Sequence, residues 1–225
     1  MALRSFLCVI LLLLAVVTAR SKFLPDDQTP SFTPLAVPPQ AAAAPIQTNS
    51  AVTTVEKGYV LGTNGMLYLT FPKNWQDKVQ HVVQRDRIFD AVFFTPTNEA
   101  YFNFTVEVAL VGETNNTNHV QLKSVLRRTG EGELTNATEI AVQLKDFRSD
   151  TATGSYFRLT DKKWGLITPP EGEAKYLTQG YASVGPLVLS FRLLSNRPTV
   201  QEPVALEVIK SARFSRTFPS AMPKK

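Results

Sequence analysis

Cysteine is nearly absent from this 225-residue chain, in which Cys8 is the only one. Because Cys8 lies in an N-terminal segment that we expect to be removed, the mature protein would have no disulfide, thiol nucleophile or thiolate metal ligand. Histidine is also scarce. The two histidines, His81 and His119, belong to no His-Glu-x-x-His or comparable metal-ligand spacing. We therefore expect no metal site and no bound cofactor.

Apolar runs long enough to span a membrane are missing as well. The run from Phe6 to Val17 has twelve residues, whereas a membrane-spanning helix needs roughly 20. It follows Arg4 and precedes the small residues Val17-Thr18-Ala19, a pattern typical of a cleaved secretory signal. We predict a signal peptide over residues 1–19 and an exported protein, periplasmic or secreted. The alternative is a retained membrane anchor, which the short run disfavours.

The composition changes after the signal peptide. Residues 20–55 contain six prolines and a run of four alanines, and closely spaced prolines favour extended, unpaired backbone. We predict a disordered linker here, with no function of its own or acting as a spacer. A single domain over residues 56–214 and a basic tail over residues 215–225 follow. A domain of this size buries roughly 70% of its unfolded surface, so it needs no disulfide.

Motifs for catalysis are not found. Ser183 lies in Gly-Tyr-Ala-Ser-Val-Gly, which lacks the glycine spacing of a hydrolase nucleophile elbow. The stretch Gly130–Glu133 has too few glycines for a phosphate-binding loop and is more simply a helix C-terminal turn. Asp86 and Asp90 as an acid–base pair are a minor alternative. We predict that the protein is not an enzyme.

Alternation of apolar and polar residues predicts several strands. The clearest is Phe102–Leu110, and the others are Met66–Phe71, Glu139–Lys145, Ser155–Thr160, Lys175–Val184 and Leu187–Ser195. Each strand has one polar face, which indicates an antiparallel sheet, because buried parallel strands are continuously apolar. We expect about six or seven strands in this sheet.

Apolar residues at helical spacing predict helices at His119–Thr129 and Val200–Ala212. The segment Trp75–Gln84 fits either a helix or a strand. We expect the Trp75 side chain to be buried in the hydrophobic core. Strands interrupted by helices without βαβ regularity indicate an α+β domain with helices flanking the antiparallel sheet.

Three stretches resemble the Mog1p/PsbP-like fold family, which includes bacterial exported members of unknown function. They are MLYLTFPKNW at Met66–Trp75, YLTQGYASVG followed by LVLSFRLLS at Tyr176–Ser195, and a C-terminal helix that ends in Ser-Ala and an aromatic residue one position later, Phe214. The resemblance implies an α/β/α sandwich. It also implies action by protein binding, as in an extrinsic photosystem II subunit and a Ran-binding transport factor, and it supplies no catalytic residue.

Trp164 is the best candidate for a partner-binding residue. It lies in a polar loop beside Lys162 and Lys163, and aromatic and cationic side chains are enriched at binding hot spots. The alternative is a loop that covers the sheet edge. The segment Phe93-Phe94-Thr95-Pro96 is a second candidate face.

Positive charge is concentrated near the C-terminus. From Pro186 to Lys225 there are seven basic and two acidic residues, and the basic ones include Arg213 and Arg216. Such a bias attracts anionic surfaces, so weak contact with an anionic envelope surface is a further prediction, with a solvated tail as the alternative. Nucleic acid is disfavoured because no basic-aromatic motif is present.

We therefore interpret the chain as an exported, non-catalytic accessory domain that binds a protein of the cell envelope. The alternative is a small-ligand carrier or hydrolase that uses a pocket between the sheet and a helix. Three Asn-x-Thr sequons, at Asn103, Asn115 and Asn136, would accept glycans in a eukaryotic secreted protein.

Overall fold

The computed structural model describes residues 53–61, 64–84, 87–97, 102–110 and 119–217. The predicted signal peptide, nearly all of the predicted linker and most of the predicted basic tail lie outside these residues. Cys8, Asp86 and Asn115 lie outside them too, so what the sequence predicts for these residues stays a prediction.

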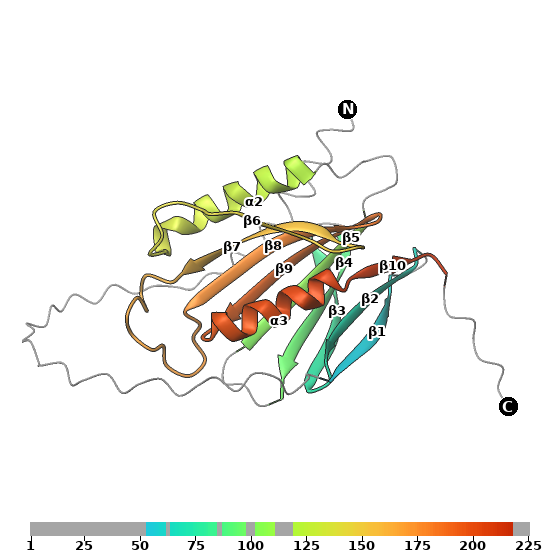
Figure 1. Cartoon of the computed structure of the whole chain (residues 1–225), viewed down its shortest axis with the longest axis horizontal. Helices are drawn as coiled ribbons and strands as arrows, with labels where there is room; N and C mark the ends of the chain where they lie inside the picture. Colours follow the sequence, from blue (N-terminus) through green and yellow to red (C-terminus); the bar gives the residue numbers. More distant parts are fainter. Residues whose placement is uncertain (1–52, 62–63, 85–86, 98–101, 111–118, 218–225) are drawn as a thin grey trace, which may run out of the picture. The chain divides into compact units, whose positions relative to one another are not determined.

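A seven-stranded antiparallel sheet forms the centre of the domain (Figure 1), with the strand order β3-β4-β5-β9-β8-β7-β6. Its strands are β3 Trp75–Gln84, β4 Arg87–Pro96, β5 Phe102–Leu110, β6 Lys145–Arg148, β7 Thr153–Thr160, β8 Tyr176–Val184 and β9 Leu187–Ser195. All six neighbouring pairs are antiparallel. This confirms the predicted sheet type and strand number, and it resolves the ambiguous segment Trp75–Gln84 as a strand.

A second sheet of three strands, in the order β1-β2-β10, was not expected from the sequence. It consists of β1 Thr54–Val60, β2 Met66–Pro72 and β10 Arg213–Ser215. Strand β10 follows the last helix and pairs antiparallel with β2, so that the C-terminal part of the domain is joined to its first hairpin.

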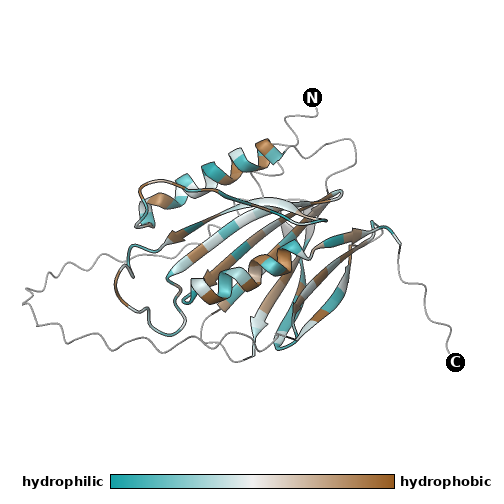
Figure 2. Ribbon diagram, in the orientation of Figure 1, coloured by the Kyte–Doolittle hydropathy of each residue, from teal (hydrophilic) through white to brown (hydrophobic). Residues whose placement is uncertain are grey.

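Two helices cover opposite faces of the central sheet. Helix α2 (His119–Glu133) packs on β7 and β8, where its Gly130 adjoins the Phe157 ring. Helix α3 (Pro198–Lys210) packs on β2, β8 and β9 and contributes to the core that contains Phe191. Phe157 and Phe191 lie opposite adjacent residues of β8, and adjacent residues in a strand face opposite ways. The helix–sheet–helix arrangement confirms the α+β prediction, and Figure 2 shows the mixed hydropathy of both helices.

An aromatic cluster fills the core on the α3 side of the sheet. The Trp75 ring centroid lies 4.8 Å from that of Phe102, 6.0 Å from that of Phe94 and 6.1 Å from that of Phe104. All four side chains are buried. The expected role of Trp75 as a core residue is therefore confirmed.

The predicted strand Glu139–Lys145 is wrong over most of its length, because only Lys145 belongs to a strand, β6. Ile140 is fully exposed. Val142 instead lies against α2, where its methyl groups would be 2.8 Å from a Cβ at Gly130. The Glu139 carboxylate accepts hydrogen bonds from the backbone N–H and the hydroxyl of Thr160, both at 2.8 Å. Side-chain contacts, and not pairing with another strand, therefore hold this segment, although its alternating apolar and polar residues predicted a strand. Helix α2 extends beyond the predicted end at Thr129, and Gly130–Glu133 form its last turn, as expected.

Gly180 of β8 allows a close approach that we expect alanine to disturb. A Cβ at this position would lie 2.3 Å from Cζ of Phe191 and 2.6 Å from the carbonyl oxygen of Ser155. Gly180→Ala should therefore lower the free energy of unfolding by about 1–3 kcal/mol through overpacking. Urea titration measures this change. Gly132→Ala is the matched control, since no atom lies within 4 Å of its Cβ position and alanine favours helix. Equal stability of the two variants would contradict the prediction.

Candidate functional site

The loop between β7 and β8, residues 161–175, is closed by its own backbone. The N–H of Asp161 donates to the carbonyl of Lys175 at 2.8 Å, so the two ends of the loop meet. Within the loop, Trp164 N–H donates to the Asp161 carbonyl at 3.1 Å, and Ile167 N–H donates to the Trp164 carbonyl at 2.7 Å. These turns fix the start of the loop, as in compact surface loops whose ends are close together.

A second segment, which follows α2, is tied to this loop. It begins with the short helix η1 (Leu134–Asn136), whose Asn136 carbonyl accepts a hydrogen bond from Lys162 N–H at 2.8 Å. Ala137 forms an isolated antiparallel bridge with Asp161. Together with the Glu139–Thr160 bonds, these contacts place the residues before Ile140 beside the start of the loop.

Large apolar side chains project from both segments. Leu166 and Ile140 are fully exposed, and Ile167 is 64% exposed. We call these three residues the loop patch. Exposed single apolar residues are common in soluble proteins, and these three lie on two segments that backbone hydrogen bonds and a β-bridge join.

The predicted residues Lys162, Lys163 and Trp164 lie at the start of the same loop, just before Leu166 and Ile167. The Trp164 ring is half-buried beneath the Lys163 ammonium, which stands 4.3 Å from the ring centroid and 3.5 Å from the Glu173 carboxylate. The indole Nε1 is buried and has no hydrogen-bond partner within the described part of the chain. Trp164 therefore both anchors the loop and leaves one donor unused, while Leu166 and Ile167, which the sequence reasoning missed, are the residues that project.

Arg213 and Arg216 are not brought to this loop. Arg213 lies in β10, where its guanidinium donates to both Glu56 carboxylate oxygens at 2.8 Å and stands 3.8 Å from the Tyr68 ring centroid. The hydrogen bond from Arg213 holds the pKa of Glu56 below its usual value. Arg216 follows β10 and is exposed. Figure 1 shows β10 and the β7–β8 loop at opposite ends of the domain. Arg213 thus fastens β10 to the other two strands of its sheet.

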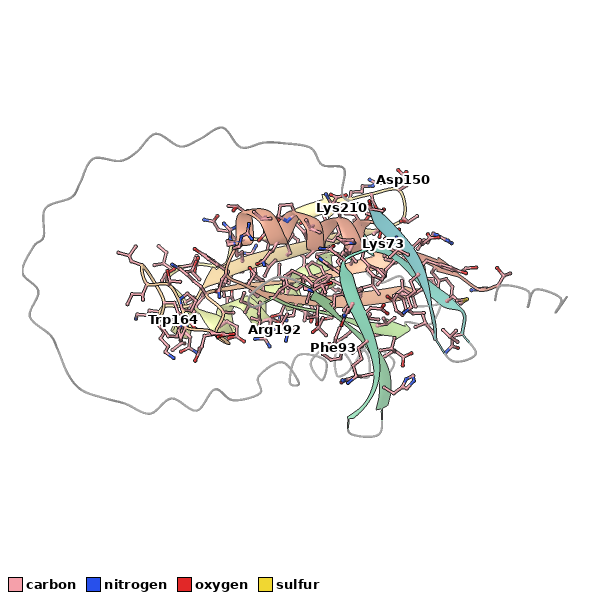
Figure 3. All side chains as sticks on the ribbon, turned by 90° about the horizontal axis from the view of Figure 1, so that it is seen from below. Lys73, Phe93, Asp150, Trp164, Arg192 and Lys210 are labelled. Carbon is pink, nitrogen blue, oxygen red and sulfur yellow. The ribbon has the colours of Figure 1, made fainter. Side chains whose placement is uncertain are left out.

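A group of polar side chains lies on the α2-side face of the central sheet. Thr105, Arg192 and Gln179 form one row across β5, β9 and β8, and Glu107, Ser190 and Tyr181 form the adjoining row. We call these six residues the polar floor. Figure 3 shows Arg192, Phe93 and Trp164 on one side of the sheet, with Lys73 and Lys210 on the other. In the sequence, these residues looked like the ordinary polar half of an alternating strand.

Burial changes the electrostatics of the polar floor. Desolvation raises the pKa of Glu107 to about 7, and the positive charge of Arg192 opposes this rise. Burial also raises the pKa of Tyr181, with a further contribution from Glu107 and an opposing hydrogen bond with Ser190. Within the described residues, Glu107 Oε2 and Gln179 Oε1 are buried without a hydrogen-bond partner. The floor therefore holds acceptors that the fold leaves unused.

The polar cluster on the opposite face differs in being well partnered. Glu202 of α3 accepts a hydrogen bond from the buried hydroxyl of Thr178 at 2.9 Å and lies 3.6 Å from the guanidinium of Arg158. Burial raises the pKa of Tyr156, and the negative charge of Glu202 raises it further. This cluster attaches α3 to the sheet, and its hydrogen-bonding groups already have partners within the protein.

The two histidines have separate surroundings. His81 and Asp90 form a cross-strand pair through Nδ1 and Oδ1 on the β3–β4 hairpin. His119, at the start of α2, lies 3.4 Å from the Ser155 hydroxyl. In the part of the chain that the structure describes, no three or more His, Cys, Asp or Glu side chains are grouped so as to hold a metal ion.

Comparison with solved structures gives a structural likeness. The solution structure of cyanobacterial PsbP (CyanoP) from Synechocystis sp. PCC 6803 matches with a TM-score of 0.46 and 11% sequence identity, covering 75% of this chain and 98% of that chain. That protein carries the PsbP name to which the sequence resemblance points. No family model and no curated protein matches the sequence. Among the described helices, none is both long and apolar enough to cross a membrane.

Proposed function

We propose that this protein is an exported, non-catalytic accessory domain of the cell envelope that binds a partner protein through the loop patch. The observation that carries the proposal is the full exposure of Leu166 and Ile140 on two segments joined by backbone hydrogen bonds. Keeping such side chains in water forgoes burial free energy, and a partner with an apolar pocket would recover it. The pattern of residues 1–19, typical of a secretory signal, supports the proposal of export.

Charge favours a protein partner over a lipid surface. Between Asp161 and Lys175 the loop has three lysines and three acidic residues, so it carries no net charge. A basic excess is what draws a segment to an anionic membrane or wall polymer. Arg213, at the other end, already pairs with Glu56. The partner we propose has an apolar pocket for Leu166 and Ile167, with acidic side chains near Lys162.

The loop patch can be tested with charge-introducing variants. Leu166→Asp should weaken binding of the purified partner at least tenfold, because truncating or charging a hot-spot residue typically costs about 2 kcal/mol or more. The partner is first captured from native envelope extract and then titrated by calorimetry. Ile140→Asp should act in the same direction.

Val120→Asp is the matched control, because Val120 is an exposed apolar residue of α2 outside the loop patch. It should bind like the unmodified protein. Equal binding by Leu166→Asp and Val120→Asp would overturn the proposal. A steep fall in affinity at moderate salt, with no effect of Leu166→Asp, would instead support electrostatic association with the envelope.

A further inference from the structure

We propose that the outer edge of β3 pairs with the same edge of a second copy of this chain, so that two central sheets join into one. Strand β3 lies at the end of the seven-stranded sheet and pairs with β4 on one side. On its other side, no strand in the described part of the chain pairs with it. The backbone N–H and C=O groups on that side are a template for a further strand. The proposal is independent of the loop patch, because no residue of the loop patch belongs to β3.

The two ends of the central sheet differ in how well they are protected against such pairing. Strand β6, at one end, has four residues, and shortness is a common protection of edge strands. Strand β3 has ten residues and contains no proline. These ten residues pair with β4 one to one, from Trp75 to Gln84, without a bulge. A long and regular edge of this kind is where an added strand binds.

The outer part of the β3–β4 hairpin lacks a third strand. Strand β5 pairs with β4 from Asp90 to Phe94, so within the described residues Arg87–Phe89 pair with β3 alone. Figure 3 shows this hairpin, beside the Phe93 label, extending beyond the other strands. A two-stranded hairpin is marginally stable in water, whereas three strands support one another. A strand added along β3 would therefore stabilise the outer part of the hairpin.

The middle of β3 is accessible to a partner. Near the start of the strand, the Asp77 carboxylate is held by Lys57 of β1, whose Nζ lies 2.7 Å away. Beyond this contact, Lys78 and Gln80 are exposed, and Val79 is 41% exposed. Strand pairing centred on these residues would meet side chains that are already in contact with water.

Symmetry and charge select one register for the pair. When a two-fold axis relates two antiparallel edge strands, one residue lies directly opposite its own copy. With that residue at Val79, Asp77 lies opposite His81 of the second copy, and Lys78 lies opposite Gln80 of the second copy. Centring the pair on Lys78 or Asp77 would instead place like charges opposite each other. Opposite charges across strands stabilise a sheet and like charges destabilise it, so the register centred on Val79 is favoured.

The side chains that meet in this register are chemically complementary. A protonated imidazole donates from both nitrogens, and His81 is paired with Asp90 through Nδ1. Its Nε2–H is therefore directed to a second acceptor, which the Asp77 carboxylate of the other copy provides. The two copies of Val79 would contact each other and remove apolar surface from water. The second copy is thus a partner that matches both the backbone and the side chains of this edge.

Sedimentation equilibrium of the purified protein over a range of concentrations tests for the dimer. We expect a reversible monomer–dimer equilibrium. Val79→Lys should raise the dissociation constant of the dimer roughly fivefold or more, because the two lysines would lie directly opposite each other. Val120→Lys, at an exposed apolar position of α2, is the matched control and should leave the dissociation constant unchanged. Leu166→Asp should also leave it unchanged, which separates the dimer from partner binding through the loop patch.

A cysteine cross-link tests the register. In a Cys8→Ser background, Val79→Cys should form a disulfide-linked dimer under mild oxidation with glutathione disulfide. Residues directly opposite in antiparallel strands have Cα atoms about 4.5–5.5 Å apart, within the range that a disulfide bridges. Gln76→Cys, also at an exposed position of β3, is the matched control. The proposed register places it roughly 20 Å from its own copy, so it should stay unlinked.

Three results would overturn the proposal. One is a protein that stays monomeric over the whole concentration range, which would leave the β3 edge to a strand of another protein or to solvent. Another is a dimer that Val79→Lys and Val120→Lys affect equally, which would place the interface elsewhere. The third is cross-linking through Gln76→Cys as efficient as through Val79→Cys. Circular dichroism spectra confirm that each variant is folded, and the cross-link remains as the test if Val79→Lys misfolds.

Discussion

Phe104→Ala is expected to lower the free energy of unfolding by about 3–5 kcal/mol, a large part of the stability of a typical domain. Phe104 is fully buried in the middle of β5. Its ring centroid lies 5.5 Å from that of Phe94 and 6.1 Å from that of Trp75. The Phe102 ring centroid lies 6.3 Å away. Alanine would remove the burial of the Phe104 ring and leave a cavity, because the three surrounding rings are held on strands of the sheet and cannot fill it.

The measurement is a urea titration at constant pH, with the slope of the transition compared between variants. Leu166→Ala serves as the control, since Leu166 is fully exposed, and it should change stability by less than about 0.5 kcal/mol. A loss below about 1 kcal/mol for Phe104→Ala would show that the aromatic cluster does not hold β5 against its neighbours.

Much of the central sheet was predictable because its strands bury one face more completely than the other. In β5 and β9 the apolar residues recur at every second position, and the helix α3 side of the sheet buries them. Trp75, which follows Pro72, was predicted as a core residue even though the secondary structure of its segment was ambiguous. The ambiguous segment from Trp75 to Gln84 could not be assigned by periodicity, since its valines fit both spacings, and only pairing with β4 along its full length decides it.

The second sheet was not predictable from local pattern. Strand β10 has three residues and pairs with β2, which lies far away in the sequence. Strand β1 is mostly exposed, so little alternation marks it. Conversely, Glu139–Lys145 alternates like a strand but is held by the Glu139 side chain and by the contact of Val142 with α2. Tertiary contacts outweigh strand propensity in both cases.

The candidate surfaces were predictable to different degrees. Trp164 was found because a large ring in a polar loop is unusual, but the exposure of Leu166 and Ile140 depends on how two distant segments meet. The polar floor depends on register. Glu107 looks like an ordinary outward residue of β5, and only its pairing with Ser190, next to Tyr181, brings these groups together. Register across three strands is a property of the whole sheet.

Glu107→Gln is expected to make the protein more stable at pH 8 and to leave its stability nearly unchanged at pH 4. Burial raises the pKa of Glu107 from 4.5 to about 7, so the folded protein binds this proton more tightly than the unfolded chain does. The free energy of unfolding therefore falls as pH rises from about 4.5 to about 7. The full change corresponds to about 3 kcal/mol, taken as an upper value because the group is partly exposed.

Glutamine has the shape of the protonated side chain and cannot ionise, so it removes this loss without removing the group's bulk. The gain at pH 8 should be about 2–3 kcal/mol by urea titration. Comparing variant and parent at each pH cancels the contributions of other groups to the pH dependence of the free energy of unfolding. Among these groups are Glu56 and Asp146, whose lowered pKa values make stability rise with pH in both proteins. Arg192 and Tyr181, the charged and titratable groups that face Glu107, are also common to both. A stability difference between variant and parent that is equal at pH 4 and pH 8 would mean that Glu107 is well solvated. Glu107 would then not be a buried acceptor of the polar floor.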